Sequence, residues 1–313
     1  MKLKKLLISI SICGIIWGVW STFFRVRHQA AKVATQPAVT ENKTATSNPA
    51  NNSANNPVTS PPKHVNPPQE PNASNQLTSD QLAKINQQIA EYSTAINANG
   101  KDKLALYDRA ELYLKKGFYD DAVADYSALI QQDNKDIKAY FYRAIAQTNR
   151  NNILEAIGDY NKVISLDPKR FVAYNNRGLL YLNKRDFDQA GNDFDKALSL
   201  NPQYTEAYYN RALLSLEAKD FADAVKDLTQ ALTLHDANDL AFEIRIRYRL
   251  AIALYNQSKY QDALTHLNIV VNLSPKDPKL YELRALTNDQ LGNRQQAFDD
   301  RNKAQELNLN NML

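Results

Sequence analysis

Apolar residues from position 80 onward fall three and four positions apart, in runs that short polar turns separate. The pattern repeats every 34 residues, from starts at 103, 137, 171, 205, 244 and 278. The eighth position of each repeat is Ala or Gly, and the twentieth is Ala. Small side chains at these two places allow two helices to pack closely, so the pattern predicts one helical hairpin per repeat.

Larger residues fill the space beside the predicted helices. The twenty-fourth position is aromatic or Leu in the first five repeats, and Pro stands at position 32 in three of them. A single hairpin leaves one apolar face uncovered, so neighbouring hairpins must stack into an elongated solenoid. The residues at position 24 are Tyr126, Tyr160, Phe194, Leu228 and Leu267, and the prolines are Pro168, Pro202 and Pro275.

A 34-residue period with these small, aromatic and proline positions resembles the tetratricopeptide repeat, over residues 103–313. The resemblance implies an all-α, right-handed α-solenoid of about six helix-turn-helix units, with a concave groove lined by the first helix of each unit. Residues 80–102 resemble the second half of a unit and are expected to cap the N-terminal end. The expected units are 103–136, 137–170, 171–204, 205–238, 244–277 and 278–311.

Two places depart from the repeat. Five extra residues, 239–243, precede the fifth unit, and the alternation over 244–250 is typical of a strand. The repeat register resumes at Leu250, which favours a lengthened first helix instead. In the last unit, Asn288 and Arg301 stand at positions that are usually large and apolar. This change suits a terminal unit with nothing packed beyond it.

The first 24 residues have the composition of a membrane anchor. Lys2, Lys4 and Lys5 precede an uncharged run at 6–24, whose 19 residues span about 28 Å as a helix, close to the thickness of a bilayer core. Bulky Trp and Phe residues leave a poor cleavage site, so a single-pass signal anchor is favoured over a cleaved signal peptide. We expect the repeat domain to be extracytoplasmic, on the periplasmic side if the cell is bacterial.

Residues 25–79 are rich in Asn, Pro, Ser and Thr and predict a disordered linker. Residues 1–79 hold eight Lys or Arg and two acids, a net charge of +6, whereas the whole chain carries +4. The repeat region therefore carries −2, which argues against a nucleic-acid-binding face. The single cysteine, Cys13, excludes an intramolecular disulfide.

Motifs for catalysis or metal binding are absent from the sequence, which has no HExxH, no paired Cys and no phosphate-binding glycine loop. We therefore expect no enzyme activity, no cofactor and no metal. Arg recurs at position 7 and Asp at position 23, and both change in the fifth unit, to Leu250 and His266. The paired change predicts an ion pair within each hairpin, and a ladder of cations for an anionic ligand is the alternative. The predicted pairs are Arg109–Asp125, Arg143–Asp159, Arg177–Asp193, Arg211–Asp227 and Arg284–Asp300.

The resemblance also implies which residues line the groove. Tyr, Asn and Arg are frequent at these positions, and they combine contact area or hydrogen bonding with a modest ordering cost. Packing without a ligand is the alternative for several of them. The predicted groove residues are Tyr107, Phe141, Tyr142, Asn175, Asn176, Leu179, Tyr209, Asn210, Leu213, Arg245, Tyr248, Arg249, Ile252 and Tyr255.

We expect a non-catalytic, membrane-anchored adaptor that binds a partner protein or an extended peptide and assembles an envelope complex. A self-associating structural scaffold without a groove ligand is the alternative. Binding of a chaperone tail through its C-terminal carboxylate fits less well. Asn210, Arg245 and Arg249 match or nearly match the residues that such domains use, but Asn175 and Leu179 do not.

Overall fold

The computed structural model describes residues 78–310, and this part of the chain folds into helices without a strand. The predicted anchor at 1–24, the linker up to residue 77 and residues 311–313 lie outside the described residues. Among the described helices, none is long and apolar enough to span a bilayer. The helices are α3 (Ser79–Ala98), α4 (Lys103–Lys116), α5 (Tyr119–Gln132), α6 (Ile137–Asn149), α7 (Ile153–Leu166), α8 (Phe171–Asn183), α9 (Phe187–Leu200), α10 (Thr205–Glu217), α11 (Phe221–Leu234), α12 (Leu240–Asn256), α13 (Tyr260–Leu273), α14 (Pro278–Gln290) and α15 (Arg294–Asn310).

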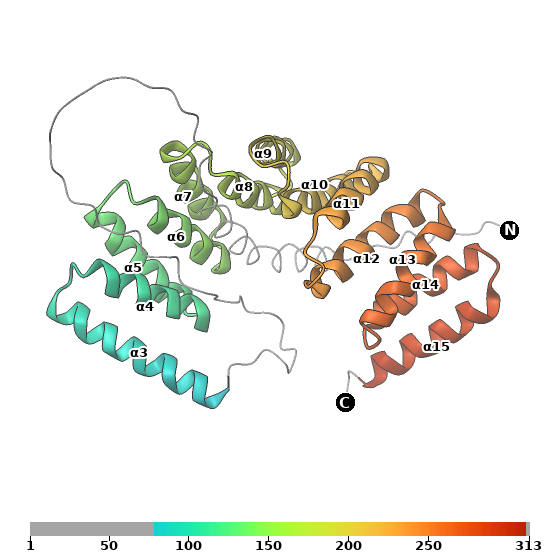
Figure 1. The fold of residues 1–313 in the computed structure, drawn as a ribbon, viewed down its shortest axis with the longest axis horizontal. Helices are drawn as coiled ribbons and strands as arrows, with labels where there is room; N and C mark the ends of the chain where they lie inside the picture. The colour runs from blue at the N-terminus through green and yellow to red at the C-terminus, as the bar shows by residue number, and fades with distance from the viewer. Residues whose placement is uncertain (1–77, 311–313) are drawn as a thin grey trace, which may run out of the picture.

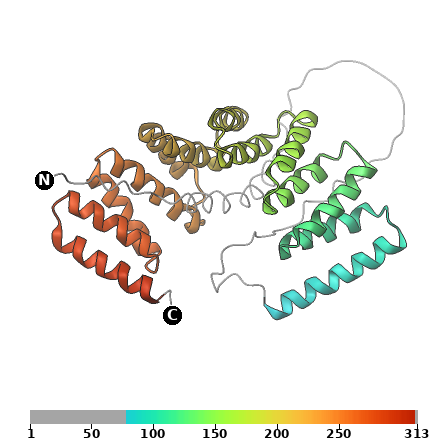
Figure 2. The same cartoon turned by 180° about the vertical axis from the view of Figure 1, so that it is seen from behind.

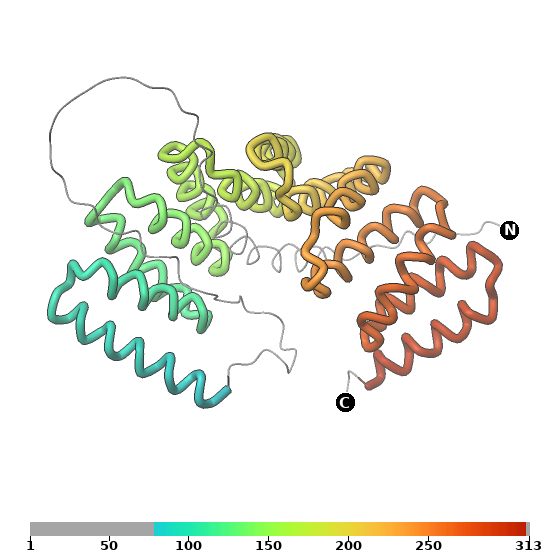
Figure 3. Tube along the Cα trace, in the orientation of Figure 1, coloured from blue at the N-terminus to red at the C-terminus, as the bar shows by residue number. Residues whose placement is uncertain are grey.

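The helices stack one after another along an arc, with α3 at one end and α15 at the other (Figure 1). The view from behind and the tube trace show the same curved path (Figures 2 and 3). Helix α9 lies on the outer side of the arc, whereas α8 and α10 lie on its inner side and contact each other. The all-helical prediction is confirmed, and the inner side is built from first helices of consecutive pairs.

The fifth pair contains the predicted exception. Residues 244–250 are helical, although their alternation is typical of a strand. Helix α12 has 17 residues, whereas α10 has 13, so the prediction of a lengthened first helix is confirmed. Asp239 caps the additional turn, because its side chain accepts a hydrogen bond from the Phe242 backbone N–H.

The turns inside the hairpins share one backbone conformation. Position 15 of every unit has a positive φ, which is 79° where the residue is Gly, at Gly117 and Gly292. In the other four units a residue with a side chain adopts φ of 62° or 63°. The left-handed conformation ends the first helix and reverses the chain within three residues. The four residues are Asn151, Arg185, Lys219 and Ser258.

Close helix packing explains the small residues of the repeat. Ala144, Ala190 and Ala212 are fully buried, and the large side chains of Tyr160 and Phe194 are buried beside them. These residues belong to one apolar cluster that runs from the second pair to the last. The apolar core is therefore continuous from the second pair to the last, whereas the first pair has a cluster of its own that contains Leu106 and Tyr126.

Each predicted arginine–aspartate pair is present and joins the two helices of its hairpin. The guanidinium Nε and Nη2 donate to both carboxylate oxygens of the aspartate at 2.6–2.9 Å. The five aspartates are buried, with 4–6% exposed. Bidentate pairing satisfies both partners, which is the condition under which a buried ion pair is tolerated. The prediction of structural ion pairs is confirmed.

The same arginines also reach the preceding hairpin. The Nη1 of each arginine donates at 2.6–3.1 Å to a polar side chain on the helix directly before its own, which is the second helix of the preceding hairpin or, for the first unit, α3. Each of these groups, which we call arginine clasps, therefore ties three helices together. The Nη1 acceptors are Ser93, Ser127, Asn161, Asp195 and Asn268.

Candidate peptide-binding surface

Three asparagines predicted for the groove form a hydrogen-bonded chain across two first helices. Asn210 of α10 donates through Nδ2 to Asn175 Oδ1 of α8 at 2.8 Å, and Asn175 donates to Asn176 Oδ1 at 3.2 Å. Asn176 then donates to the hydroxyl of Tyr160 on α7 at 3.2 Å. All three amides are fully buried. Buried amides need such partners, so this chain fixes how α8 and α10 are placed against each other.

Aromatic contacts continue the surface toward the fifth pair. The rings of Tyr209 on α10 and Phe242 on α12 pack edge to face, with their centroids 5.3 Å apart. The guanidinium carbon of Arg245 lies 5.0 Å from the centre of the Phe242 ring, within the range of a cation–π contact. Arg249 lies 5.9 Å from the Tyr248 ring. The first helices of the fourth and fifth pairs thus carry two sets of aromatic and cationic side chains, of which Arg245 and Tyr248 are partly exposed.

A second aromatic cluster lies toward the N-terminal end. Phe141 packs edge to face against both Tyr142 and Tyr160. Lys138 Nζ lies 4.3 Å from the centre of the Tyr107 ring, whose hydroxyl donates a hydrogen bond to Asp136. Burial raises the pKa of the Tyr107 hydroxyl, and the bond to Asp136 raises it further. This hydroxyl therefore stays protonated across the physiological range and acts as a donor.

Several polar atoms on the inner helices are buried without a hydrogen-bond partner. They include Tyr209 Oη, Asn210 Oδ1 and the Nε and Nη2 of Arg245. An unsatisfied buried donor or acceptor costs about 1 to 3 kcal/mol. Tyr209 and Asn210 are fully buried, whereas Arg245 is partly exposed. Of the three residues, Arg245 is therefore the one with unused hydrogen-bonding capacity toward a ligand.

The predicted groove residues divide into two groups by exposure. Eight are buried, and six are partly exposed. The buried residues Leu179, Leu213 and Ile252 belong to the continuous apolar cluster. Tyr255 packs against Tyr260, its neighbour across the turn. The partly exposed residues are Tyr107, Phe141, Tyr142, Arg245, Tyr248 and Tyr255.

Three contributors to this surface were absent from the prediction. Phe242 lies in the five-residue insertion, where the repeat assigns no position. Tyr160 was assigned to the core, and it also accepts the bond from Asn176. Lys138 is the second residue of its unit, a position that faces the groove in the family, and it was omitted from the prediction. Its position in the repeat was the one signal that could have identified it.

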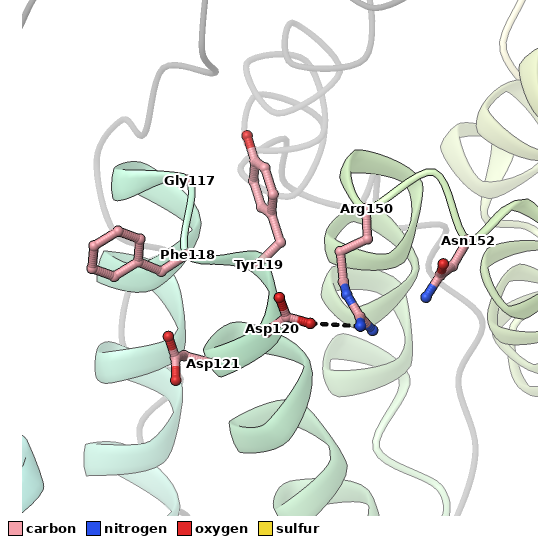
Figure 4. A pocket seen from close by; sticks show the side chains of 7 residues that line it. All are labelled: Gly117, Phe118, Tyr119, Asp120, Asp121, Arg150 and Asn152. Atoms are coloured by element: carbon pink, nitrogen blue, oxygen red, sulfur yellow. Dashed lines mark ion pairs between the residues drawn. The ribbon is translucent and has the colours of Figure 1, made fainter.

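An open polar pocket lies elsewhere, between the turns of the first two hairpins (Figure 4). Its volume is about 490 Å³, and Phe118, Tyr119 and Asn152 contribute to its walls. Arg150 and Asp120 form an ion pair at 2.5 Å across it. The pocket is formed by turn residues rather than by the inner faces of the helices. Within the described residues, no group of His, Cys, Asp and Glu is suited to hold a metal ion.

Comparison with known proteins identifies the class. Four models of the tetratricopeptide repeat match the chain, over residues 107–170, 171–204, 194–226 and 215–286. The matches run without a gap from 107 to 286. The chain belongs to the tetratricopeptide repeat family. The fold of this family indicates a protein–protein interaction adaptor, and its members are generally non-catalytic scaffolds.

Solved structures share the fold at low sequence identity. YrrB, described as a repeat protein with an unusual peptide-binding site, is 22% identical with a TM-score of 0.51, covering 60% of this chain and 94% of its own. A repeat protein from Parabacteroides merdae is 20% identical with a TM-score of 0.55, covering 73% and 89%. MamA from Desulfovibrio magneticus is 20% identical with a TM-score of 0.51, covering 56% and 96%. No functionally curated protein matches the chain significantly.

Proposed function

We propose that the solenoid is a non-catalytic adaptor that binds an extended peptide segment of a partner protein along its inner surface. The observation that carries this proposal is Arg245 of α12, a partly exposed arginine whose Nε and Nη2 have no hydrogen-bond partner. An extended backbone presents alternating N–H donors and C=O acceptors, and its carbonyls can accept from the guanidinium of Arg245.

The neighbouring side chains suit the same kind of ligand. Phe141 and Tyr248 are partly exposed aromatic residues on first helices, and such side chains provide contact area at a low entropic cost. Arg245 adds a positive charge whose only described contact is the Phe242 ring. An acidic side chain or a C-terminal carboxylate of the peptide would pair with this charge. YrrB, which shares the fold, is a peptide-binding protein by its description.

Residues 1–24 serve in this proposal as a single-pass membrane anchor and residues 25–77 as a tether, with the repeat domain on the extracytoplasmic side. The adaptor would then assemble an envelope complex close to the bilayer. Extraction of membranes with alkaline carbonate tests the anchor, because an integral helix stays in the pellet. Digestion by a protease added outside intact cells or spheroplasts tests the orientation.

Site-specific photo-crosslinking tests the binding surface. A photoreactive phenylalanine analogue replaces Tyr248, which is partly exposed, and in a matched strain it replaces Lys219 on the exposed turn of the fourth hairpin. We expect a discrete adduct from position 248 alone, with the crosslinked peptide identified by mass spectrometry. Arg245→Glu in the same protein should abolish the adduct while the helical circular dichroism is unchanged.

The outcomes separate the proposal from its alternatives. An adduct of the chain with itself at position 248 would support the self-associating scaffold. An adduct limited to the last residue of a chaperone tail would support carboxylate binding. Equal labelling at both positions, or labelling that survives Arg245→Glu, would refute the inner surface as a specific site.

A further inference from the structure

We call the contact between two consecutive hairpins a joint, and one joint of the solenoid lacks an arginine clasp. In the fifth hairpin Leu250 stands where the other hairpins have the arginine, and His266 stands where they have the aspartate. Thr229 of α11 occupies the place of a clasp acceptor, and its hydroxyl donates to the carbonyl of Val225 in its own helix. The contacts that connect the fourth hairpin to the fifth therefore differ from those at the other joints.

A chain of titratable side chains occupies this joint instead. His235, the residue that ends α11, places its Nε2 at 3.6 Å from Glu243 Oε2 of α12. Glu243 Oε1 accepts from Arg247 Nε at 2.6 Å, and Arg247 Nη1 lies 3.3 Å from His266 Nδ1 on α13. The chain thus links three consecutive helices, and it contains both histidines of residues 78–310.

The protonation state of His266 follows from its partner. Arginine can only donate, so the Nδ1 that faces Arg247 must accept, and the ring is neutral with its proton on Nε2. Burial lowers the pKa of His266 and the charge of Arg247 lowers it further, while Asp262 on its own helix opposes them. On the α14 side, the nearest clasp arginine, Arg284, is already paired with Asp300 and bound to Asn268.

The other end of this series of titratable side chains, at His235, faces acidic rather than basic groups. Glu243 is the carboxylate that faces His235 across the joint, and Asp236 and Asp239 follow His235 in the connecting segment. The hydrogen bond and charge of Arg247 lower the pKa of Glu243, so this carboxylate is ionised across the physiological range.

We propose that the joint between α11, α12 and α13 is a proton-sensitive hinge. Protonation of His266 removes the Nδ1 lone pair that accepts from Arg247 and places two cations in contact, which releases α12 from α13. Apolar contacts such as the Tyr209–Phe242 ring pair do not titrate, so they keep the joint assembled while its angle changes.

The hinge also bears on binding, in a way that rests on the proposed function. Helix α12 carries Arg245 and Tyr248, whereas Tyr209 and Asn210 lie on α10. A change of angle at this joint alters the spacing between these two groups. The affinity for a peptide should then differ between neutral and mildly acidic pH. The hinge itself does not require that the surface binds a peptide.

Pulsed electron paramagnetic resonance on the full-length chain tests the hinge without any ligand. Spin labels are attached to cysteines at the exposed positions Gln230 of α11 and Gln261 of α13, in a Cys13→Ser background. The matched control pair is Lys196 and Ala222, which occupy the same repeat positions one unit earlier and are also exposed. Distances are measured near pH 7.5 and near pH 5, on either side of an ordinary histidine pKa of about 6.5.

We expect the 230–261 distance to shift on acidification by more than the width of the control distribution, while the 196–222 distance is unchanged. The shift should disappear in His266→Leu. It should also disappear in the double variant Leu250→Arg with His266→Asp, which restores the residues of a clasp. No shift at 230–261, an equal shift in the control pair, or a shift that persists in both variants would overturn the hinge.

Discussion

Gly178 offers a test of how closely the two helices of a hairpin approach. It lies inside α8, where Ala is ordinarily the better helix former by about 1 kcal/mol. A Cβ added at Gly178 would lie 2.8 Å from Phe194 Cε1 and 3.1 Å from Asp193 Cβ. Phe194 is fully buried, and Asp193 is held by its arginine clasp, so neither has room to move.

The expected magnitude is the difference of two effects. Overpacking a filled core costs about 1 to 3 kcal/mol, and the helix propensity of Ala returns about 1 kcal/mol. Gly178→Ala should therefore lower the free energy of unfolding by up to about 2 kcal/mol. Gly158 in the preceding helix is the matched control, because an added Cβ there meets no atom within 4 Å. Gly158→Ala should raise the free energy of unfolding by about 0.5 to 1 kcal/mol.

Urea unfolding followed by far-ultraviolet circular dichroism measures both variants. The two glycines lie in consecutive helices, so they report on the same cooperative region of the solenoid. Phe194→Leu should relieve the clash, since the fourth hairpin already combines Ala212 with Leu228. In that background Gly178→Ala should become stabilising. An equal stabilisation by Gly158→Ala and Gly178→Ala in the parent chain would refute the close approach.

Three further outcomes are expected. Asp159→Ala leaves the half-buried Arg143 unpaired and should cost about 2 to 4 kcal/mol in urea unfolding, whereas Asp120→Ala, at a pair whose carboxylate is 79% exposed, should cost about 0 to 1 kcal/mol. Because the pKa of His266 is lower in the folded state, its contribution to stability is complete above about pH 6.5 and falls as the pH drops toward the folded pKa, with a slope of at most about 1.4 kcal/mol per pH unit. His266→Leu should flatten that slope between pH 7 and 5, and an unchanged slope would contradict it. Lys219→Gly should raise stability by up to about 1 kcal/mol in thermal or urea unfolding, since Lys219 has a φ of 62°.

The sequence was sufficient to predict the features that depend on spacing along one hairpin. The period of 34 residues located the helices, since small residues at fixed positions allow only close pairing. The covariation of Arg and Asp within one chain predicted the ion pairs, because two opposite charges that appear and disappear together are neighbours. The same reasoning did not reveal that Nη1 of these arginines reaches the preceding hairpin. The acceptor varies among Ser, Asn and Asp, so no single residue type marks it.

Features that depend on the angle between hairpins were not predictable. The bond between Asn175 and Asn210 joins residues 35 apart, and it requires α8 and α10 to meet with their asparagines facing each other. Asn288 was expected to suit a face with nothing packed beyond it, but it is 4% exposed and donates to Asp300 at 3.3 Å. A polar residue in a terminal hairpin can be satisfied inside that hairpin, so polarity alone did not indicate exposure. Arg301 is exposed and pairs with Asp289, as a solvent-facing position allows.

The exceptions to the repeat are concentrated at one joint, and this has a physical consequence. The five-residue insertion supplies Phe242 and Glu243, which contact Tyr209 on one side and Arg247 on the other. The loss of the clasp at this joint removes the contact that makes the other joints alike. Repetition makes a solenoid stiff, because every joint has the same contacts and no one of them yields first. A joint with a different, titratable set of contacts is where we expect such a structure to bend, and here it includes α12, which carries the partly exposed Arg245.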